Sequence, residues 1–303
     1  MPIAVIIFDF DPFAQLFGDL AVRWGTVALT LAIVLSFILA AVLARGGGLR
    51  VDDIAFIAVG IVPGAVVGGR IGFALIHWSF YGADPGVLID PSVGGLDLGL
   101  AVVGGTLSGS YVASLLGAPL GRWLHVAAAP ALFVIGSGKL SMVLSGAGQG
   151  APSDEAWATA YAGAGPWGSL APAIPSNPSQ AYEGVASLAI LAVLAVFLIV
   201  GAFRRRDGRV FYLAIGLWAI ARAAVSMTWR DPAAAAGLPA AGIIAVSIAI
   251  GCAILFVGLT VLNLVRGPTH GPEASPLDAD VPSAEITTSG DLPTTDPESR
   301  RAV

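Results

Sequence analysis

Seven long apolar stretches constrain this 303-residue chain more than any other feature of its sequence. A helix that crosses the hydrocarbon core of a bilayer needs about 20 predominantly apolar residues. Each stretch satisfies its own backbone hydrogen bonds in lipid if it is helical. We therefore predict an all-α integral membrane protein with seven transmembrane helices, at Trp24–Ala44, Ile54–His77, Leu98–Leu116, Leu124–Ser145, Tyr182–Phe203, Val210–Thr228 and Leu238–Val265.

The composition agrees with a lipid environment. Only 12% of the residues are charged, whereas soluble domains carry about 25%. The sequence contains no basic tract that would indicate a nucleic-acid partner. Cys252 is the single cysteine, which excludes a disulfide or a cysteine metal site within the chain. The sequence suggests no metal and no organic cofactor.

The orientation is predicted from the arginines that lie outside the apolar stretches, because cytoplasmic loops of membrane proteins are enriched in basic residues. An outside N-terminus leaves only Arg23 and Arg230 on the outer side. The C-terminus is then cytoplasmic, as in a multi-pass membrane protein. The cytoplasmic side receives Arg45, Arg50, Arg122, Arg204, Arg205, Arg206, Arg209, Arg266, Arg300 and Arg301.

Three segments flank or interrupt the helices. Residues 1–23 are predicted to be extracytoplasmic, with Met1–Leu20 as an interfacial helix, because this segment lacks the basic start of a signal peptide. An outer loop is expected at about 146–181. The segment 24–265 is the transmembrane domain. The tail 266–303 is rich in Pro, Thr, Ser and Asp and is predicted to be disordered.

Three cations fall inside the predicted helices: Arg70, Lys139 and Arg222. A charge at the centre of a spanning helix costs at least about 2.5–3.5 kcal/mol, so such residues face a cavity or an anionic partner. Glu183 is the best candidate counter-charge, but one carboxylate cannot balance three cations. Two interpretations follow: structural ion pairs, or a cavity that binds a lipid phosphate, which guanidinium groups grip through paired hydrogen bonds.

Glycines gather beside these cations. Gly60, Gly64, Gly68 and Gly72 recur at four-residue spacing along the second predicted helix. Small residues at this spacing are typical of close helix packing in membranes, which explains most of them. Room for a lipid headgroup is the alternative.

The outer loop leads into the fifth predicted helix through several polar residues. Ser179 is placed to cap that helix, and Gln180, Tyr182 and Glu183 follow on its first turns. Their local chemistry favours a well-formed helix start.

Six short motifs follow one another along the chain. They are Arg23-Trp24-Gly25, Gly68-Gly69-Arg70-Ile71-Gly72, Gly104-Gly105, Pro166-Trp167, Pro178-Ser179-Gln180-Ala181-Tyr182-Glu183 and Arg230-Asp231-Pro232. Over roughly Asp11–Leu264, their order and spacing resemble the prolipoprotein diacylglyceryl transferase family. The Pro-Ser-Gln-x-Tyr-Glu element is the most specific of these resemblances.

The chain also departs from the family at polar positions. Val103 stands where the family has a His, and Lys139 replaces the arginine of its signature motif. Ser226 stands where the family has a Glu. Met142, Ser145 and Ala147 replace two amides and a carboxylate of that signature.

The resemblance implies transfer of a diacylglyceryl group from phosphatidylglycerol to the cysteine thiol of a prolipoprotein signal peptide, with release of glycerol phosphate. The implied partners are phosphatidylglycerol, prolipoprotein signal peptides and membrane lipid. The catalytic candidates are Arg222, Lys139 and Glu183. The candidate substrate-binding residues are Arg70, Lys139, Arg222, Ser179, Gln180 and Tyr182.

Two other functional classes stay open. A catalytically silent or repurposed lipid-binding paralogue would keep the cations and lose acid–base groups, as the departures partly show. A small-molecule transporter would show broken helices or an inverted repeat, and we find no convincing repeat in the sequence.

Overall fold

The computed structural model describes residues 5–17, 20–90, 92–163 and 165–266. It contains seven helices that are long and apolar enough to cross a membrane. They lie within a few residues of the predicted stretches and so confirm them. Their bounds are α1 (Trp24–Gly46), α2 (Asp53–Ile76), α4 (Leu98–Leu115), α5 (Leu120–Val143), α6 (Ser179–Ile199), α7 (Arg209–Ser226) and α8 (Ala240–Val265).

Contacts divide the chain into residues 1–262 and 263–303. Of the second unit, the structure describes only residues 263–266, so the predicted disordered tail lies almost wholly outside the described residues.

The predicted interfacial helix near the N-terminus is wrong, because the described residues there form strands. Strand β1 (Ile6–Phe8) pairs in parallel with β4 (Thr159–Tyr161) of the outer loop, and β2 (Phe13–Phe17) pairs antiparallel with β3 (Leu20–Arg23). The outer loop satisfies the β1 backbone: the Ile6 N–H donates to Ala158 and the Ala162 N–H to Phe8. The Phe8 ring stacks on Tyr161, with centroids 5.1 Å apart. Tertiary pairing thus overrides the local apolar signal.

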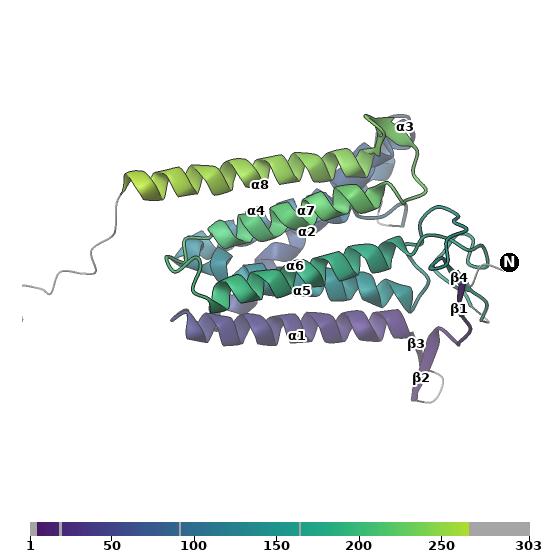
Figure 1. The fold of residues 1–303 in the computed structure, drawn as a ribbon, viewed down its shortest axis with the longest axis horizontal. Helices are drawn as coiled ribbons and strands as arrows, with labels where there is room; N and C mark the ends of the chain where they lie inside the picture. Colours follow the sequence, from purple (N-terminus) through teal and green to yellow (C-terminus); the bar gives the residue numbers. More distant parts are fainter. Residues whose placement is uncertain (1–4, 18–19, 91, 164, 267–303) are drawn as a thin grey trace, which may run out of the picture. The chain divides into compact units, whose positions relative to one another are not determined.

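Shorter elements complete the connections at the same end of the bundle as β1 and β4 (Figure 1). Helix α3 (Trp78–Tyr81) and the 3₁₀ helix η1 (Pro85–Ile89) join α2 to α4. Strands β5 (Ala233–Ala235) and β6 (Leu238–Pro239) form a small hairpin between α7 and α8.

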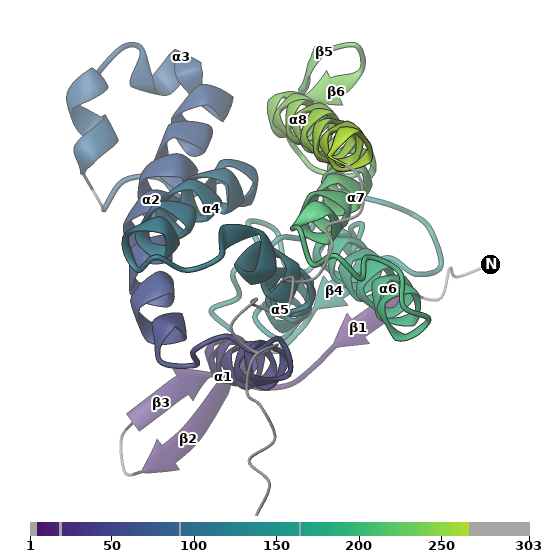
Figure 2. The same cartoon turned by 90° about the vertical axis from the view of Figure 1, so that its left-hand side faces the viewer.

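The helices form two groups when viewed along the bundle (Figure 2). Helix α5 packs against α1, α6 and α7, while α2 and α4 contact mainly each other. Glycines explain the close α2–α4 approach: a Cβ on Gly64 would run into the Gly104 carbonyl, and one on Gly104 into the Gly64 carbonyl. This contact confirms the packing interpretation of the glycines at four-residue spacing.

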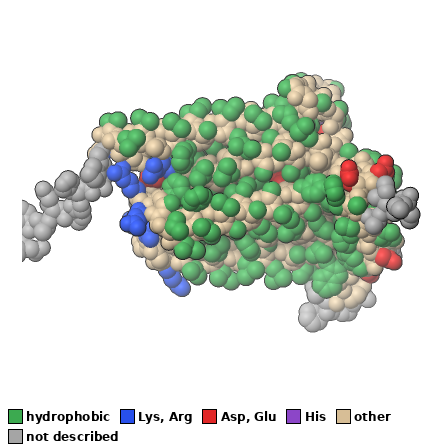
Figure 3. Space-filling view, viewed as in Figure 1, with side chains coloured by type: hydrophobic (Ala, Val, Ile, Leu, Met, Phe, Trp, Pro, Cys, Tyr) green, Lys and Arg blue, Asp and Glu red, His purple; other side chains and the backbone are tan. Residues whose placement is uncertain are grey.

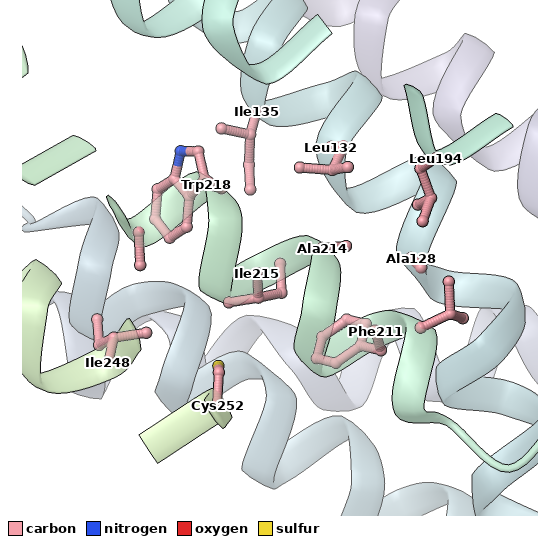
Figure 4. Close-up of a cluster of buried hydrophobic side chains, with 12 residues drawn as sticks. Ala128, Leu132, Ile135, Leu194, Phe211, Ala214, Ile215, Trp218, Ile248 and Cys252 are labelled. Carbon is pink, nitrogen blue, oxygen red and sulfur yellow. The ribbon is translucent and has the colours of Figure 1, made fainter. Parts of the chain in front are cut away.

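A buried apolar cluster lies between α5, α6, α7 and α8 (Figure 4). Trp218 of α7 is fully buried there, beside Ile215 of the same helix and Leu132 of α5. This cluster holds α7 in a defined rotation, which places the polar residues of its last turns.

Charged side chains gather at opposite ends of the molecule. Figure 3 shows basic residues at the end where α1 and α6 finish, acidic residues at the other end, and a broad hydrophobic belt between them. The belt is what a bilayer requires of a spanning protein.

Candidate functional site

Four charged side chains form a buried cluster at the end of the bundle that carries the outer loop. Arg222 donates from Nη1 to both oxygens of Glu183, at 2.8 and 3.1 Å, and from Nη2 to Asp97 Oδ1 at 2.9 Å. Lys139 Nζ lies 2.9 Å from Glu183 Oε2. Glu183 therefore bridges the two cations, and Arg222 bridges the two carboxylates.

The ends of four helices bring these groups together. Lys139 lies four residues before the end of α5, Arg222 lies four before the end of α7, and Glu183 lies four after the start of α6. Asp97 caps α4, with Oδ2 accepting the Leu100 N–H at 2.8 Å. The cluster therefore lies about one turn inside the helix ends.

The cluster is electrically balanced, with two cations and two anions. The side chains of Asp97 and Glu183 are each 1% exposed, and those of Arg222 and Lys139 are 4% and 16% exposed. An uncompensated charge at such a site would be strongly destabilising. The ion pairs of the structural interpretation are therefore present, and their geometry does not exclude phosphate binding.

The sequence analysis proposed Lys139, Glu183 and Arg222 as site residues but missed Asp97, which directly precedes the predicted helix Leu98–Leu116. The available signal was an Asp directly before an apolar stretch, which is typical of a helix cap. Its ion pair with Arg222 depends on the packing of α4 near α7 and could not be read from the sequence.

Two indole rings flank the Arg222 guanidinium. Its Cζ lies 4.8 Å from the ring centroid of Trp229 and 5.8 Å from that of Trp218. Lys139 Nζ lies 5.8 Å from the Trp229 ring. Among the described residues, Arg222 Nε is buried without a hydrogen-bond partner. The guanidinium therefore has one donor that could bind a further acceptor.

A polar cavity of about 340 Å³ adjoins the cluster. Lys139 and Glu183 line it from the cluster side, and Trp229, Arg230 and Asp231 line it from the connection after α7. Arg230 is held by the Gly150 carbonyl, at 2.7 Å from Nε, and by Ser176 Oγ.

The start of α6 contributes to this cavity differently from what its sequence predicted. Gln180 is buried, lines the cavity and donates from Nε2 to Tyr161 Oη, which donates to the Val143 carbonyl at 2.9 Å. Burial raises the pKa of Tyr161 to about 12, so the phenol stays protonated at neutral pH.

The predicted Ser179 cap is wrong: Pro178 holds the cap position, and Ser179 Oγ lies 2.7 Å from Thr228 Oγ1. Ser179 instead ties α6 to the residues after α7.

Tyr182 is partly exposed and does not line the polar cavity. Ser179, Gln180 and Tyr182 therefore lie in three different environments.

Arg70 does not join the charged cluster. Its guanidinium donates to four backbone carbonyls of the connection between α2 and α4, namely those of Val87, Leu88, Asp90 and Val93. These contacts occupy the hydrogen-bond donors of this cation near the end of α2. Arg70 thereby orders the connection that leads to Asp97.

An apolar cavity of about 490 Å³ lies between the two helix groups, lined by α1, α2, α4 and α5. Leu98 and Ile135 are part of its wall. Leu98 directly follows Asp97, and Ile135 lies four residues, about one turn, before Lys139 on α5. Two residues of the cavity wall therefore lie within about one helical turn, along the chain, of Asp97 and Lys139 of the charged cluster.

The described residues contain no group of three or more His, Cys, Asp or Glu side chains that could hold a metal ion.

Comparison with known proteins identifies the fold that carries this site. The family profile of prolipoprotein diacylglyceryl transferase matches residues 12–261. The chain belongs to the prolipoprotein diacylglyceryl transferase family. The matched range includes all seven spanning helices except the last turn of α8.

Several relatives of this family member are named phosphatidylglycerol–prolipoprotein diacylglyceryl transferase. One from Geobacter sulfurreducens is 29% identical over 270 residues, covering 86% of this chain and 98% of the relative. One from Symbiobacterium thermophilum is 30% identical over 38% of this chain and 44% of its own length. One from Thermus thermophilus is 31% identical over 43% of this chain and 46% of its own length.

The departures seen in the sequence are accommodated locally in this prolipoprotein diacylglyceryl transferase relative. Ser226 is buried and donates to the Ala223 carbonyl at 2.6 Å, and Ser145 donates to the Met142 carbonyl. Val103 packs against the apolar cluster of Figure 4. These positions contribute to packing, and the charges of the site come from Asp97, Lys139, Glu183 and Arg222.

Proposed function

We propose that this chain transfers the diacylglyceryl group of phosphatidylglycerol to the cysteine thiol of a prolipoprotein signal peptide. Membership of the family supports the reaction. The observation that carries the proposal for this chain is a buried cluster with two cations, of which Lys139 lines a polar cavity, and an apolar cavity whose wall includes Leu98 and Ile135, close in sequence to Asp97 and Lys139 of the cluster. A phospholipid needs the same combination of an anion site and an apolar compartment.

We propose further that the N-terminus and the site face the outside of a bacterial inner membrane. The basic end of the molecule in Figure 3 then faces the cytoplasm, as the positive-inside rule requires. Residues 1–23 and the connection 144–178 would lie at the outer interface, with 24–265 as the spanning domain. This orientation gives the polar cavity access to the side on which signal peptides emerge.

The acyl chains are assigned to the apolar cavity. Its wall includes Ile33, Phe37, Ile61, Ala65, Leu98 and Ile135. Each methylene removed from water contributes about 0.8 kcal/mol, but a lipid that moves in from the bilayer gains little of this. The cavity therefore selects chain shape, and the polar contacts supply the net preference for a phospholipid.

The phosphate is assigned to Arg222 and Lys139. In the reaction, the cysteine sulfur forms a bond to the glycerol carbon that carries the phosphate, and the carbon–oxygen bond breaks. The bonding electron pair leaves with the phosphate as glycerol phosphate, and the thiol proton passes to an acceptor. Fixed cations stabilise the charge that develops on the leaving phosphate, and in a site of low dielectric they do so strongly.

Two carboxylates line the cavity that the thiol would enter, Glu183 and Asp231. Both oxygens of Glu183 are engaged by Arg222 and Lys139, which supports a positioning role for this residue. Asp231 is exposed in the connection after α7. We propose both carboxylates as candidate acceptors of the thiol proton, and substitution of each residue distinguishes between them.

The proposal is tested by replacing a bacterium's own diacylglyceryl transferase with this gene and by following labelled lipid onto a lipobox peptide. Rescue and label transfer that disappear in Arg222→Ala are the expected result. Asp53→Asn is the control, because Asp53 is buried and paired with Arg50 at the start of α2. Absence of both rescue and transfer in folded, inserted protein would refute the activity.

A lipid-binding paralogue without catalysis is the second candidate. The observation in its favour is that the carboxylates of the cluster are already paired with cations. It predicts phosphatidylglycerol binding without label transfer.

A further inference from the structure

On the guanidinium edge of Arg222 that faces Asp97, one of the two N–H donors is hydrogen-bonded and the other is not. On a guanidinium group, Nε–H and one Nη–H point the same way and form a fork that matches two oxygens of a carboxylate or phosphate. Arg222 Nη2 donates to Asp97 Oδ1 at 2.9 Å. Its Nε, although buried, has no partner among the described residues.

Another arginine of the chain shows the same fork fully occupied. Arg50 donates from Nε to Asp53 Oδ2 at 3.2 Å and from Nη2 to Asp53 Oδ1 at 2.9 Å. Asp97 does not adopt this geometry: its Oδ1 accepts from Nη2, and its Oδ2 accepts the Leu100 N–H as the cap of α4. Asp97 therefore divides its two oxygens between Arg222 and the helix cap.

The opposite edge of the guanidinium is occupied. Nη1 donates to both oxygens of Glu183, and Glu183 is held in turn by Lys139. Of the two carboxylates, Asp97 is thus the more weakly held on Arg222. An anion that offers two oxygens would use Nε and Nη2 together and would satisfy the unpartnered donor.

The charge balance points the same way. The two cations and two carboxylates sum to zero, so a phosphodiester adds an anion to a neutral, buried cluster. In a site of low dielectric, like charges at contact distance repel strongly. Phosphate binding is therefore opposed as long as Asp97 keeps its charge at Arg222.

Resting on the proposed function, we propose that Asp97 is a substitute anion that occupies half of the phosphate-binding edge of Arg222. The phosphate of a phospholipid displaces it and takes both Nε and Nη2. Asp97 then keeps only its cap bond to Leu100. Asp97 thus sets how tightly the site holds an anionic lipid.

The test is lipid binding by the purified full-length protein in the absence of peptide. Asp97→Asn keeps a cap acceptor, since Asn and Asp are comparable at this position, and removes the charge; its amide nitrogen cannot accept from Nη2. We expect phosphatidylglycerol to bind about tenfold more tightly to this variant. Diacylglycerol with the same chains, which lacks the phosphate, should bind equally to both proteins.

Two controls and one contradicting outcome complete the test. Asp53→Asn, the same change at another buried Asp, should leave phosphatidylglycerol binding unchanged. Glycerol phosphate, which lacks acyl chains, separates lipid from free phosphate: an effect of Asp97→Asn on it alone would overturn the lipid assignment. Unchanged or weaker phosphatidylglycerol binding by folded Asp97→Asn would overturn the displacement itself.

A measurement on the unaltered protein covers the case in which Asp97→Asn does not fold. The Arg222 Nε–H resonance, assigned by its loss in Arg222→Lys, should move downfield when phosphatidylglycerol binds and should not move with diacylglycerol. No movement at saturating lipid would refute the displacement. Because none of these readouts needs transfer, the inference and the proposed activity can fail separately.

Discussion

The Trp229 ring lies over Arg222, with 4.8 Å between the ring centroid and the guanidinium carbon, and it also lies 5.8 Å from Lys139 Nζ. One aromatic side chain therefore touches both cations of the cluster and, at the same time, the wall of the polar cavity. It lies where the ion pair of Lys139 and Glu183 borders the polar cavity, which all three side chains line.

Replacing Trp229 tests this contact. Cation–π interactions contribute about 0.5–2 kcal/mol, so Trp229→Leu should lower the transfer rate roughly three- to thirtyfold. Trp229→Phe, which keeps an aromatic face, should retain most of the rate. Steady-state label transfer to a lipobox peptide measures both, and equal losses in the two variants would argue against the cation–π role.

Neutralising Lys139 should be more severe. In Lys139→Met, the cluster carries a net charge of −1, and one of the two groups assigned to the phosphate is lost. Removal of one electrostatic donor in other enzymes costs about 100- to 1,000-fold in rate, and we expect a loss of that order. Lys139→Arg keeps the charge and should retain measurable transfer; an inactive but folded Lys139→Arg would show that the ammonium geometry itself is required.

The acceptor of the thiol proton is distinguished by measuring transfer and lipid binding separately. If Asp231 accepts the proton, Asp231→Asn should slow transfer without weakening phosphatidylglycerol binding, while Glu183→Gln should mainly reduce phosphatidylglycerol binding. The reverse assignment of the two effects would favour Glu183 as the acceptor. Thermal unfolding in detergent serves as the control for both variants.

Arg70 should act on stability and order of the connection between α2 and α4. Arg70→Gln loses most of the four carbonyl contacts. Hydrogen bonds to charged groups contribute about 1.5–3 kcal/mol each, so the loss of two or more should destabilise the protein by at least about 3 kcal/mol. Limited proteolysis within residues 82–97 and thermal unfolding measure the change. Unaltered cleavage would contradict the structural role of Arg70.

The α2–α4 contact should not tolerate a side chain. Gly64→Val forces atoms against the Gly104 carbonyl and Ser108, and overpacking of this kind costs about 1–3 kcal/mol or more. Gly258→Ala on α8 is the matched control, because a Cβ there meets nothing within 4 Å. Yield of folded protein and unfolding temperature should fall only in the first variant.

The spanning helices were readable from the sequence because lipid imposes a single rule on every residue of a span. The orientation remains a proposal that the arginine distribution supports. The buried cations Lys139 and Arg222 were also readable, since a charge within an apolar stretch is conspicuous in any chain.

What the sequence concealed depends on contacts between distant segments. Asp97 lies at a helix boundary, where an acidic residue has an ordinary local explanation, and its ion pair spans 125 positions to Arg222. Arg70 looked like Arg222 in sequence, yet the carbonyls of a following connection satisfy it. The segment around Ile6–Phe8 has the apolar character of an interfacial helix, and only its partner in the outer loop makes it a strand.

The parallel pairing of β1 with β4 also sets an order of events during synthesis. The ribosome makes Ile6 more than 150 positions before its partner Thr159. At about 5–20 residues per second, roughly 8–30 seconds separate the two. The first strand must therefore wait, already across the membrane in the proposed orientation, while four helices are inserted behind it. Pairing of β1 with β4 is therefore a late step of biogenesis. A bulky group fused before Ile6 would interfere with folding only at that step.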